Sequence, residues 1–236
     1  MKTVGFFVLI VSVVLLSCDK DNTKQISTDL PAFSQIDLNS SFDVFLSEDT
    51  VFSIKIIGDK HVVDQVDYYV EDSILHIGLE SHTKWLTPRR NKIELRITSQ
   101  PLKLVNANHT CFIRTSTPIT SEEFGLIFRS KANQADLELN CNTFFYYDNY
   151  PCGGKLTLSG TAQAIKIWNY AIVSVDASQL TTNYALVQNQ AKNDCSVRVL
   201  EQLDYGIEGE GNIYLYGDPP LIQNLGVSST GKLIQY

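Results

Sequence analysis

The sequence predicts an all-β domain whose short strands stack coil on coil. Two observations lead to this prediction. Apolar and polar residues alternate in many short runs, from residues 42–46 near the beginning to residues 213–215 near the end, and a period of two is typical of half-buried strands. Turns of small and polar residues recur between these runs at spacings of 20 to 31 residues, which lie in the range of solenoid repeats.

The second half of the chain carries these repeated turns, at residues 130–133, 159–162, 189–192, 208–211 and 228–231. A single coil cannot bury its apolar side, but a stack of coils can. Twelve of the 15 asparagines follow residue 100. Asparagine tolerates left-handed backbone, and its amide can form a ladder with the coil below. A β-sandwich of hairpins is the alternative, and the absence of an Asn-Gly or Asp-Gly dipeptide disfavours it.

One segment has the spacing of a helix instead. Apolar or aromatic residues stand at positions 62, 63, 66 and 69, and Asp59 before them is a good N-cap. We therefore expect one short helix near residues 60–68.

The N-terminus has the features of an export signal. After Lys2, residues 4–16 form an uncharged and mostly apolar stretch, which is too short for a comfortable membrane span and fits a signal sequence. It leads into Leu-Leu-Ser-Cys at residues 15–18, which resembles the lipobox of bacterial lipoproteins. An ordinary secretory signal followed by a chance cysteine is the alternative interpretation.

The lipobox resemblance implies a division of the chain. Residues 1–17 are the signal peptide, Cys18 is the lipidated residue, residues 18–30 form a polar tether, and residues 31–236 form a single domain. Several acyl chains on one residue anchor a protein firmly, whereas one chain binds weakly. We therefore expect a protein of the bacterial cell envelope, attached to a membrane through lipid on Cys18. The expected place is the outer membrane, on its periplasmic face or at the cell surface.

Composition limits the other partners. The 236 residues are 44% hydrophobic and 19% charged, which is enough for a packed core and excludes wholesale disorder. The formal net charge is −7, and neither half of the chain is basic, so we do not expect nucleic acid as a partner. No second long apolar run follows the signal, so no spanning helix is expected.

Four cysteines remain after the signal, at positions 111, 141, 152 and 195. An oxidising compartment permits disulfides, and four cysteines allow three connectivities. Cys141 and Cys152 bracket an aromatic segment and are the pair that we expect, if any forms. Alternatively, all four are small buried hydrophobic residues. No Cys-x-x-Cys spacing is present, so we expect no metal site.

The aromatic segment at residues 144–150 holds five aromatic residues in seven. Alternation would place Phe144, Tyr146 and Asp148 on one side, with Phe145, Tyr147 and Asn149 on the other. One coil has a single interior side, so some rings should remain outside.

We expect these rings to form a projecting patch, held at its base by Cys141 and Cys152. The candidate binding residues of the patch are Tyr146, Tyr147, Tyr150, Asp148 and Asn149, since tyrosines beside hydrogen-bonding groups are common at sugar-binding and protein-binding surfaces. The alternative is that the rings stack on a neighbouring coil.

Catalytic motifs are missing from the sequence. It contains no His-Glu-x-x-His, Gly-x-Ser-x-Gly, phosphate-binding glycine loop or EF-hand spacing. Glu208 and Glu210 could share a strand face and work as a pair, but their neighbours Gly209 and Gly211 favour a solvated turn. We therefore predict no enzyme, no catalytic residue and no cofactor.

Five parts of the chain resemble a family of bacterial auto-transporter adhesins with a head GIN domain, and together they extend over about residues 31–236. These parts are residues 33–38, 41–46, 51–79, 93–104 and 216–233. The family's coils usually carry Ser-Gly-Ser-Gly, from which the turns near residues 106–109, 130–133 and 189–192 depart. The resemblance implies a right-handed parallel β-helix-like solenoid.

These inferences favour a lipid-anchored envelope protein with a non-catalytic role in surface binding or adhesion, with a glycan or a surface protein as its partner. Two alternatives stay open. One is a structural or assembly protein of the periplasm, and the other is a β-helix carbohydrate-active enzyme, because such enzymes also use this fold.

Overall fold

The computed structural model describes residues 22–79, 93–149 and 151–236. Strands make up 67% and helix 2%, so the all-β prediction is confirmed. The elements, in chain order, are β1 (Thr23–Asp29), β2 (Gln35–Leu38), β3 (Asp43–Glu48), β4 (Ser53–Asp59), α1 (Lys60–Val63), β5 (Val66–Glu71), β6 (Ile74–Leu79), β7 (Glu94–Ser99), β8 (Leu104–Ala107), β9 (Phe112–Thr115), β10 (Glu123–Phe128), β11 (Asn133–Asp148), β12 (Gly153–Asn169), β13 (Ile172–Asn189), β14 (Cys195–Ile207), β15 (Ile213–Tyr216), β16 (Leu221–Val227) and β17 (Leu233–Gln235).

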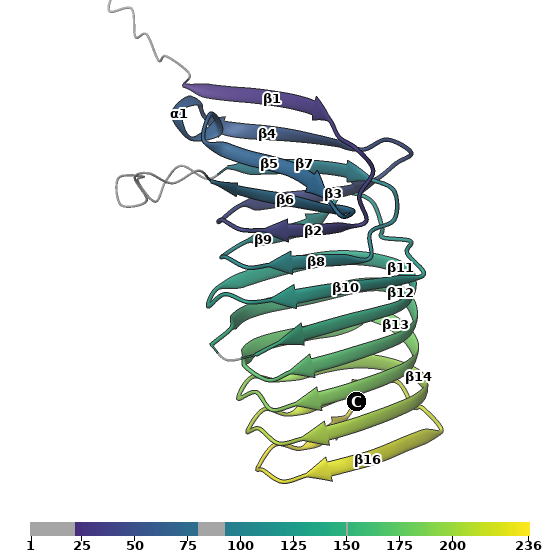
Figure 1. Ribbon diagram of the computed structural model, residues 1–236. Coiled ribbons are helices and arrows are strands. Elements are labelled where there is room, and N and C mark those ends of the chain that lie inside the picture. The colour runs from purple at the N-terminus through teal and green to yellow at the C-terminus, as the bar shows by residue number, and fades with distance from the viewer. Residues whose placement is uncertain (1–21, 80–92, 150) are drawn as a thin grey trace, which may run out of the picture.

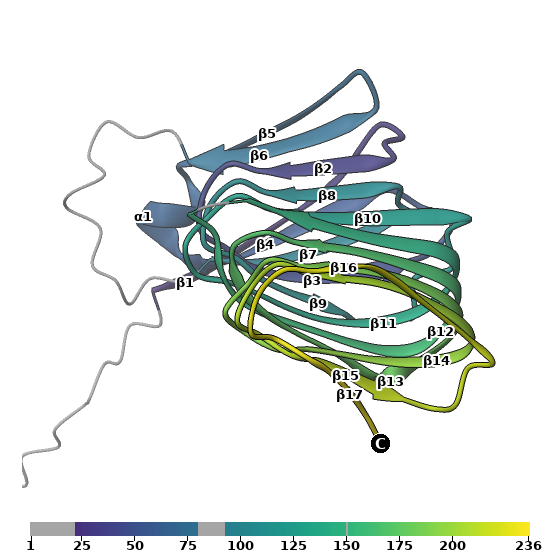
Figure 2. The ribbon, with the colours of Figure 1, turned by 90° about the horizontal axis from the view of Figure 1, so that it is seen from below.

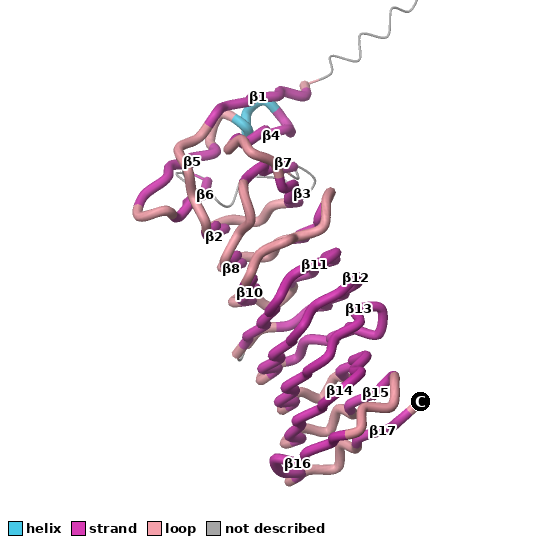
Figure 3. The backbone as a smooth tube through the Cα atoms, turned by 90° about the vertical axis from the view of Figure 1, so that its right-hand side faces the viewer, coloured by secondary structure: helices cyan, strands magenta, loops and turns pink. Residues whose placement is uncertain are grey.

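The strands wind into a β-solenoid of about seven turns (Figure 1). Two faces enclose the core. Face A runs from β5 and β6 through β2, β8 and β10 to β16, and face B runs from β1, β4, β7, β3 and β9 to β15 and β17. The long strands β11 to β14 bend midway and contribute to both faces, as the view along the stack shows (Figure 2). The predicted solenoid is therefore confirmed, and Figure 3 shows its coils from the side.

Each coil on face A is shorter than the longest turn spacings in the sequence indicated. On face A, Leu104 pairs with Gly125, Gly125 with Phe145, and Phe145 with Lys166, so each coil here takes 20 or 21 residues. The longer spacings in the sequence arose because the segment at residues 159–162 is not an end turn. Gly160 is a corner inside β12, with φ +98°, and an added Cβ would lie 2.1 Å from a backbone oxygen of the coil above.

The N-terminal part departs from the parallel pattern. Parallel pairing joins β2 to β6 and β8, and β3 to β7 and β9, but β4 pairs antiparallel with β1 and β7, and β5 with β6. The turn between β5 and β6 uses Asp72 and Ser73 at φ 49° and 62°. A two-residue hairpin therefore exists without glycine, because aspartate tolerates the left-handed region.

Two boundary predictions need correction. Residues 23–29 were expected in a polar tether but form β1, because alternate side chains such as Ile26 and Thr28 turn toward the sheet and the backbone pairs along β4. The helix ends at Val63 rather than near residue 68. Its predicted cap is confirmed, since an Asp59 carboxylate oxygen accepts a hydrogen bond from the His61 backbone N–H at 2.9 Å.

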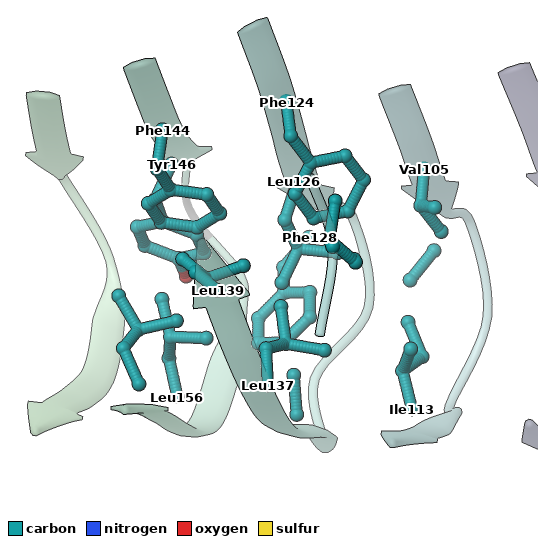
Figure 4. Packing of buried hydrophobic residues seen from close by; sticks show 14 of the residues in the cluster. Val105, Ile113, Phe124, Leu126, Phe128, Leu137, Leu139, Phe144, Tyr146 and Leu156 are labelled. Carbon is teal, nitrogen blue, oxygen red and sulfur yellow. The ribbon is translucent and has the colours of Figure 1, made fainter. Parts of the chain in front are cut away.

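Large inward side chains fill the space between the two faces (Figure 4). Phe124 and Phe128 of β10 pack against Phe144 and Tyr146 of β11, with ring centroids 5.9 Å apart in the first pair and 5.4 Å in the second. All four residues have no exposed surface. The aromatic run in the sequence is therefore partly a core feature.

An asparagine ladder runs through the later coils. The Asn169 amide Nδ2 donates to Oδ1 of Asn189 at 3.1 Å and to the Val173 carbonyl at 2.8 Å. One coil further, Asn189 Nδ2 lies 3.2 Å from the carbonyl of Gly211. Both asparagines are fully buried, which confirms the expected role of asparagine amides between coils.

Candidate functional site

The aromatic segment lies in the second half of β11 and does not project. Its alternation is as predicted: Phe144, Tyr146 and Asp148 point inward and are buried, whereas Phe145 and Tyr147 point outward and are half-buried. Tyr146 and Asp148 were therefore wrong as surface binding residues. They occupy the interior side of a strand that pairs on both edges, with β10 and β12.

The buried Asp148 carboxylate is fully engaged in hydrogen bonds within the protein. One carboxylate oxygen accepts hydrogen bonds from the backbone N–H groups of Tyr170 at 2.6 Å and Ala171 at 3.1 Å, and the other accepts from the Tyr146 hydroxyl at 2.8 Å. Burial raises the pKa of the carboxyl above its ordinary value. Burial, with the nearby Asp148 charge, also raises the pKa of Tyr146. These groups connect two coils and are inaccessible to a ligand.

The predicted disulfide is absent, because all four cysteines within the described ranges are free and buried. Between Cys141 and Cys152, residues 143–148 form a strand that spans roughly 17 Å. The Cys152 thiol lies at the far end of this strand and donates to the Phe128 carbonyl at 3.0 Å. Burial raises the pKa of Cys141 to about 11, so this thiol stays protonated and packs as a small hydrophobic group.

Two other predicted residues lie beyond the described ranges, and one is at the surface. Cys18 and Tyr150 fall among residues whose structure is not described. Asn149 follows β11 directly and is exposed. Tyr147 and Asn149 are therefore the predicted binding residues that the structure places outside.

Tyr147 belongs to a larger group of outward side chains on face A, which we call the aromatic band. Its members are Ile127 of β10, Phe145 and Tyr147 of β11, Trp168 of β12, Tyr170 just after β12, and Leu186 of β13, all half-buried. Tyr147 stands between Ile127 and Trp168 in the strand register. Its ring meets that of Tyr170 edge to face at 5.9 Å. Four successive strands thus contribute to the band, in which Lys166 of β12 stands between Phe145 and Leu186 in the strand register.

A glycine shapes this surface. Gly125 pairs with Phe145 across the strands, and a Cβ at Gly125 would lie 2.1 Å from the tip of the Phe145 ring. The ring therefore lies flat across the neighbouring strand and does not stand away from the sheet. Any larger residue at position 125 would displace the Phe145 ring and change the shape of the surface that the band presents.

Polar side chains flank the aromatic band at both ends. On the N-terminal side, the Asn106 amide donates to an Asp37 carboxylate oxygen at 2.7 Å. On the C-terminal side, Asp204 pairs with Leu186 in the strand register and accepts a hydrogen bond from the Tyr184 hydroxyl at 2.8 Å. An apolar centre with a polar rim is the usual composition of a contact surface.

Sequence reasoning missed most of the aromatic band. Trp168, Tyr170 and Leu186 are separated in the chain from the aromatic run and meet it only because each coil returns after about 20 residues. Aligning the chain at that coil length would have placed Ile127, Tyr147 and Trp168 in one column. The turns gave a longer and irregular period, so this column was not visible.

The carboxylates considered for catalysis have separate partners. Glu208 accepts a hydrogen bond from the Gln190 amide at 2.9 Å, and Glu210 forms an ion pair with Lys192 at 3.4 Å. Within residues 22–79, 93–149 and 151–236, no group of three or more His, Cys, Asp or Glu side chains is arranged to hold a metal ion. No helix in these same ranges has the length and apolar character needed to cross a membrane.

Comparison with solved structures supports the fold. The chain is similar to "a putative adhesin" from Bacteroides fragilis, with a TM-score of 0.82 and 17% identity over 92% of this chain and 98% of that chain. It is also similar to a "putative lipid binding protein" from Parabacteroides distasonis, with a TM-score of 0.66 and 16% identity over 92% and 98% of the two chains. At these identities the likeness shows the fold alone.

The family comparison covers the same part of the chain. No curated protein matches significantly. The family model described as "Putative auto-transporter adhesin, head GIN domain" matches residues 32–219, which extend from just before β2 to just after β15. Because that match spans most of the chain, the protein belongs to the head GIN domain family.

Proposed function

We propose that this protein is a non-catalytic adhesion protein of the bacterial cell envelope, anchored by lipid on Cys18, and that the aromatic band binds its ligand. The ligand is a glycan or a protein at another surface. Aromatic rings contribute large contact area and stack on the apolar faces of sugars and side chains, while the polar rim supplies hydrogen bonds.

The observation that carries the proposal is the arrangement of the band on a rigid scaffold. Its rings come from strands that are hydrogen-bonded on both sides, so a ligand meets a preformed surface and little conformational entropy is lost on binding. An adhesin role also fits the descriptions of the family and of the similar structure from Bacteroides fragilis. Acyl chains on Cys18 would hold this surface at a membrane.

Removing two rings of the band should abolish binding without unfolding the protein. In Tyr147→Ala combined with Trp168→Ala, the lost side chains are half-buried and point away from the core, so we expect the melting temperature to fall by only a few degrees. Binding is measured on a glycan array and by pull-down of envelope proteins.

The matched control is Tyr214→Ala, which removes a half-buried tyrosine from face B. This variant should retain the ligands of the parent protein. If the band variant keeps full binding, or if Tyr214→Ala loses as much, the aromatic band is not the contact surface.

The anchor has its own test. Changing Cys18 to alanine removes the thiol that would carry the lipid, so we expect the protein to remain unprocessed or to leave the membrane fraction. Cell fractionation and the mass of the mature N-terminus measure this. Unchanged processing and unchanged partition into membranes in the variant would rule out lipidation at Cys18.

A further inference from the structure

A second surface of interest lies on face B, opposite the aromatic band, in the N-terminal coils. Five neighbouring strands, β1, β4, β7, β3 and β9, place two rows of outward side chains beside each other. The first row is Ser27, Lys55, Arg96, Phe45 and Arg114, and the second is Asp29, Ser53, Thr98, Ser47 and Ser116. One row is rich in cations and the other in hydroxyl groups.

Aromatic rings lie against two cations of the first row, and the Arg114 guanidinium also stands 3.4 Å from the centroid of the Phe112 ring. The guanidinium groups of Arg96 and Arg114 lie 5.5 Å and 5.2 Å from the centroid of the Phe45 ring, which separates them. Adjacent strands are about 4.8 Å apart, so Lys55 on the next strand stands close to Arg96. Arg96 Nε donates to Glu94 at 2.7 Å, which fixes one edge of the guanidinium, and within the described ranges its two terminal nitrogens have no acceptor.

The side chains of the two rows surround a depression of about 510 Å³, lined by Lys55, Arg96, Asp29, Ile54 and six residues that carry hydroxyl groups. This volume is within the range of small-molecule sites. Within the described part of the chain, the side chains of Lys55, Ser53 and Thr98 make no hydrogen bond or ion pair. The depression therefore presents a cation and hydroxyl groups that have no partner among the described residues, with the Asp29 carboxylate beside them.

We propose that this depression binds a saccharide that carries an anionic group, either a carboxylate or a sulfate. The anionic group lies between the Lys55 ammonium and the Arg96 guanidinium, where charge-assisted hydrogen bonds are strongest. The hydroxyl groups of Ser53 and Thr98 and the Asp29 carboxylate then exchange hydrogen bonds with the sugar hydroxyls.

The charges around the depression favour a saccharide with one anionic group over a polyanion. Asp29 lines one side, Glu94 borders Arg96, and Asp136 stands beside Arg114 in the strand register. These carboxylates repel further negative charge, whereas Lys55 and Arg96 accept a single anionic group between them. The proposal goes beyond the adhesion function, because it concerns different residues on the other face.

The test measures binding of three galacto-oligosaccharides to the full chain by calorimetry: one that carries a single galacturonate, one that carries a single sulfate ester, and the neutral parent. We expect at least one of the two acidic saccharides to bind at least tenfold more tightly than the neutral one, with an affinity that falls as salt rises. Lys55→Ala should weaken that binding at least tenfold, and Lys55→Arg should restore most of it. Ser53→Ala should weaken it by a smaller factor.

Three controls make the result specific. Lys155→Ala removes an exposed lysine from face B outside the depression and should leave the affinity unchanged, as should Tyr147→Ala with Trp168→Ala on face A. Free sulfate or acetate should compete weakly, since neither carries the sugar hydroxyls. The proposal is overturned if neither acidic saccharide binds, if the neutral one binds equally well, or if Lys155→Ala costs as much affinity as Lys55→Ala.

Discussion

Replacing Tyr146 with alanine should lower the free energy of unfolding by about 3–5 kcal/mol, the usual cost of removing a large buried ring. The ring is fully buried and packs edge to face on Phe128, with the centroids 5.4 Å apart, and its hydroxyl donates a hydrogen bond to Asp148. Tyr147→Ala, one position along the same strand, should cost about 1 kcal/mol, because that ring lies on the outer side. Urea denaturation of the two variants measures the difference.

A third variant separates packing from hydrogen bonding. Tyr146→Phe keeps the ring and removes only the hydroxyl, so the Asp148 carboxylate loses one donor at a cost of about 1 kcal/mol. If Tyr146→Ala and Tyr147→Ala destabilise equally, the strand does not have the inner and outer sides described above.

Asp148 should respond in opposite directions to two substitutions. Asp148→Ala leaves the backbone N–H groups of Tyr170 and Ala171 and the Tyr146 hydroxyl without their acceptor, so we expect a loss of about 3–5 kcal/mol. Asp148→Asn keeps one acceptor oxygen for the backbone N–H groups of Tyr170 and Ala171, and its amide nitrogen replaces the oxygen that accepts from Tyr146. The Tyr146 hydroxyl then accepts from this amide instead of donating to it. Stability of both variants is measured by urea denaturation.

The asparagine ladder explains why an asparagine side chain should fit at position 148. Asp148 is the next position after the Tyr147–Trp168 pair, so Asn169 is its neighbour one coil on. Oδ1 of Asn169 is buried and has no hydrogen-bond partner among the described residues. An amide at position 148 could donate to it as Asn169 donates to Asn189, and we expect Asp148→Asn to gain about 1 kcal/mol at pH 7.

The stability that Asp148→Asn gains should increase as the pH rises. Burial raises the pKa of Asp148 in the folded protein, so the fold favours the neutral carboxyl, while the unfolded chain ionises near pH 4. The stability that this group contributes is complete below about pH 4 and is lost as pH rises through the folded-state pKa. The Asn variant has no such loss, so its advantage should be larger at pH 7 than at pH 4. An advantage that shrinks with rising pH would contradict this assignment.

The sequence predicted what depends on local alternation and missed what depends on distance along the chain. The inward and outward sides of residues 144–149 followed from a period of two, because side-chain direction in a strand is a local property. Predicting that Tyr146 is buried required knowing that other coils cover the interior side of its strand. The partnership of Tyr147 with Trp168 required the length of a coil, which the irregular turns concealed.

The N-terminal differences have the same origin. The hydrogen-bonding partners of β1 and β4 lie on strands distant in sequence. The polar composition of residues 23–29 therefore indicated a tether, whereas in the structure their backbone forms an antiparallel edge strand. The helix was overestimated because Val66 and Tyr69 fit helical spacing and β-propensity equally well. Tertiary pairing with β6 decided in favour of the strand.

Under the adhesion function proposed above, the place of the aromatic band along the stack determines which hydrogen bonds carry mechanical load. The described fold begins at β1, at one end of the solenoid, and the band lies on the coils from β10 to β13 (Figure 1). From β7 onward each coil is joined to the next by hydrogen bonds between parallel strands, whereas β1, β4 and β7 pair antiparallel, and coils touch only their neighbours. A pull between the N-terminal end and a ligand on the band therefore stretches the coils up to β13, while β15, β16 and β17 lie beyond the point of attachment and bear no tension.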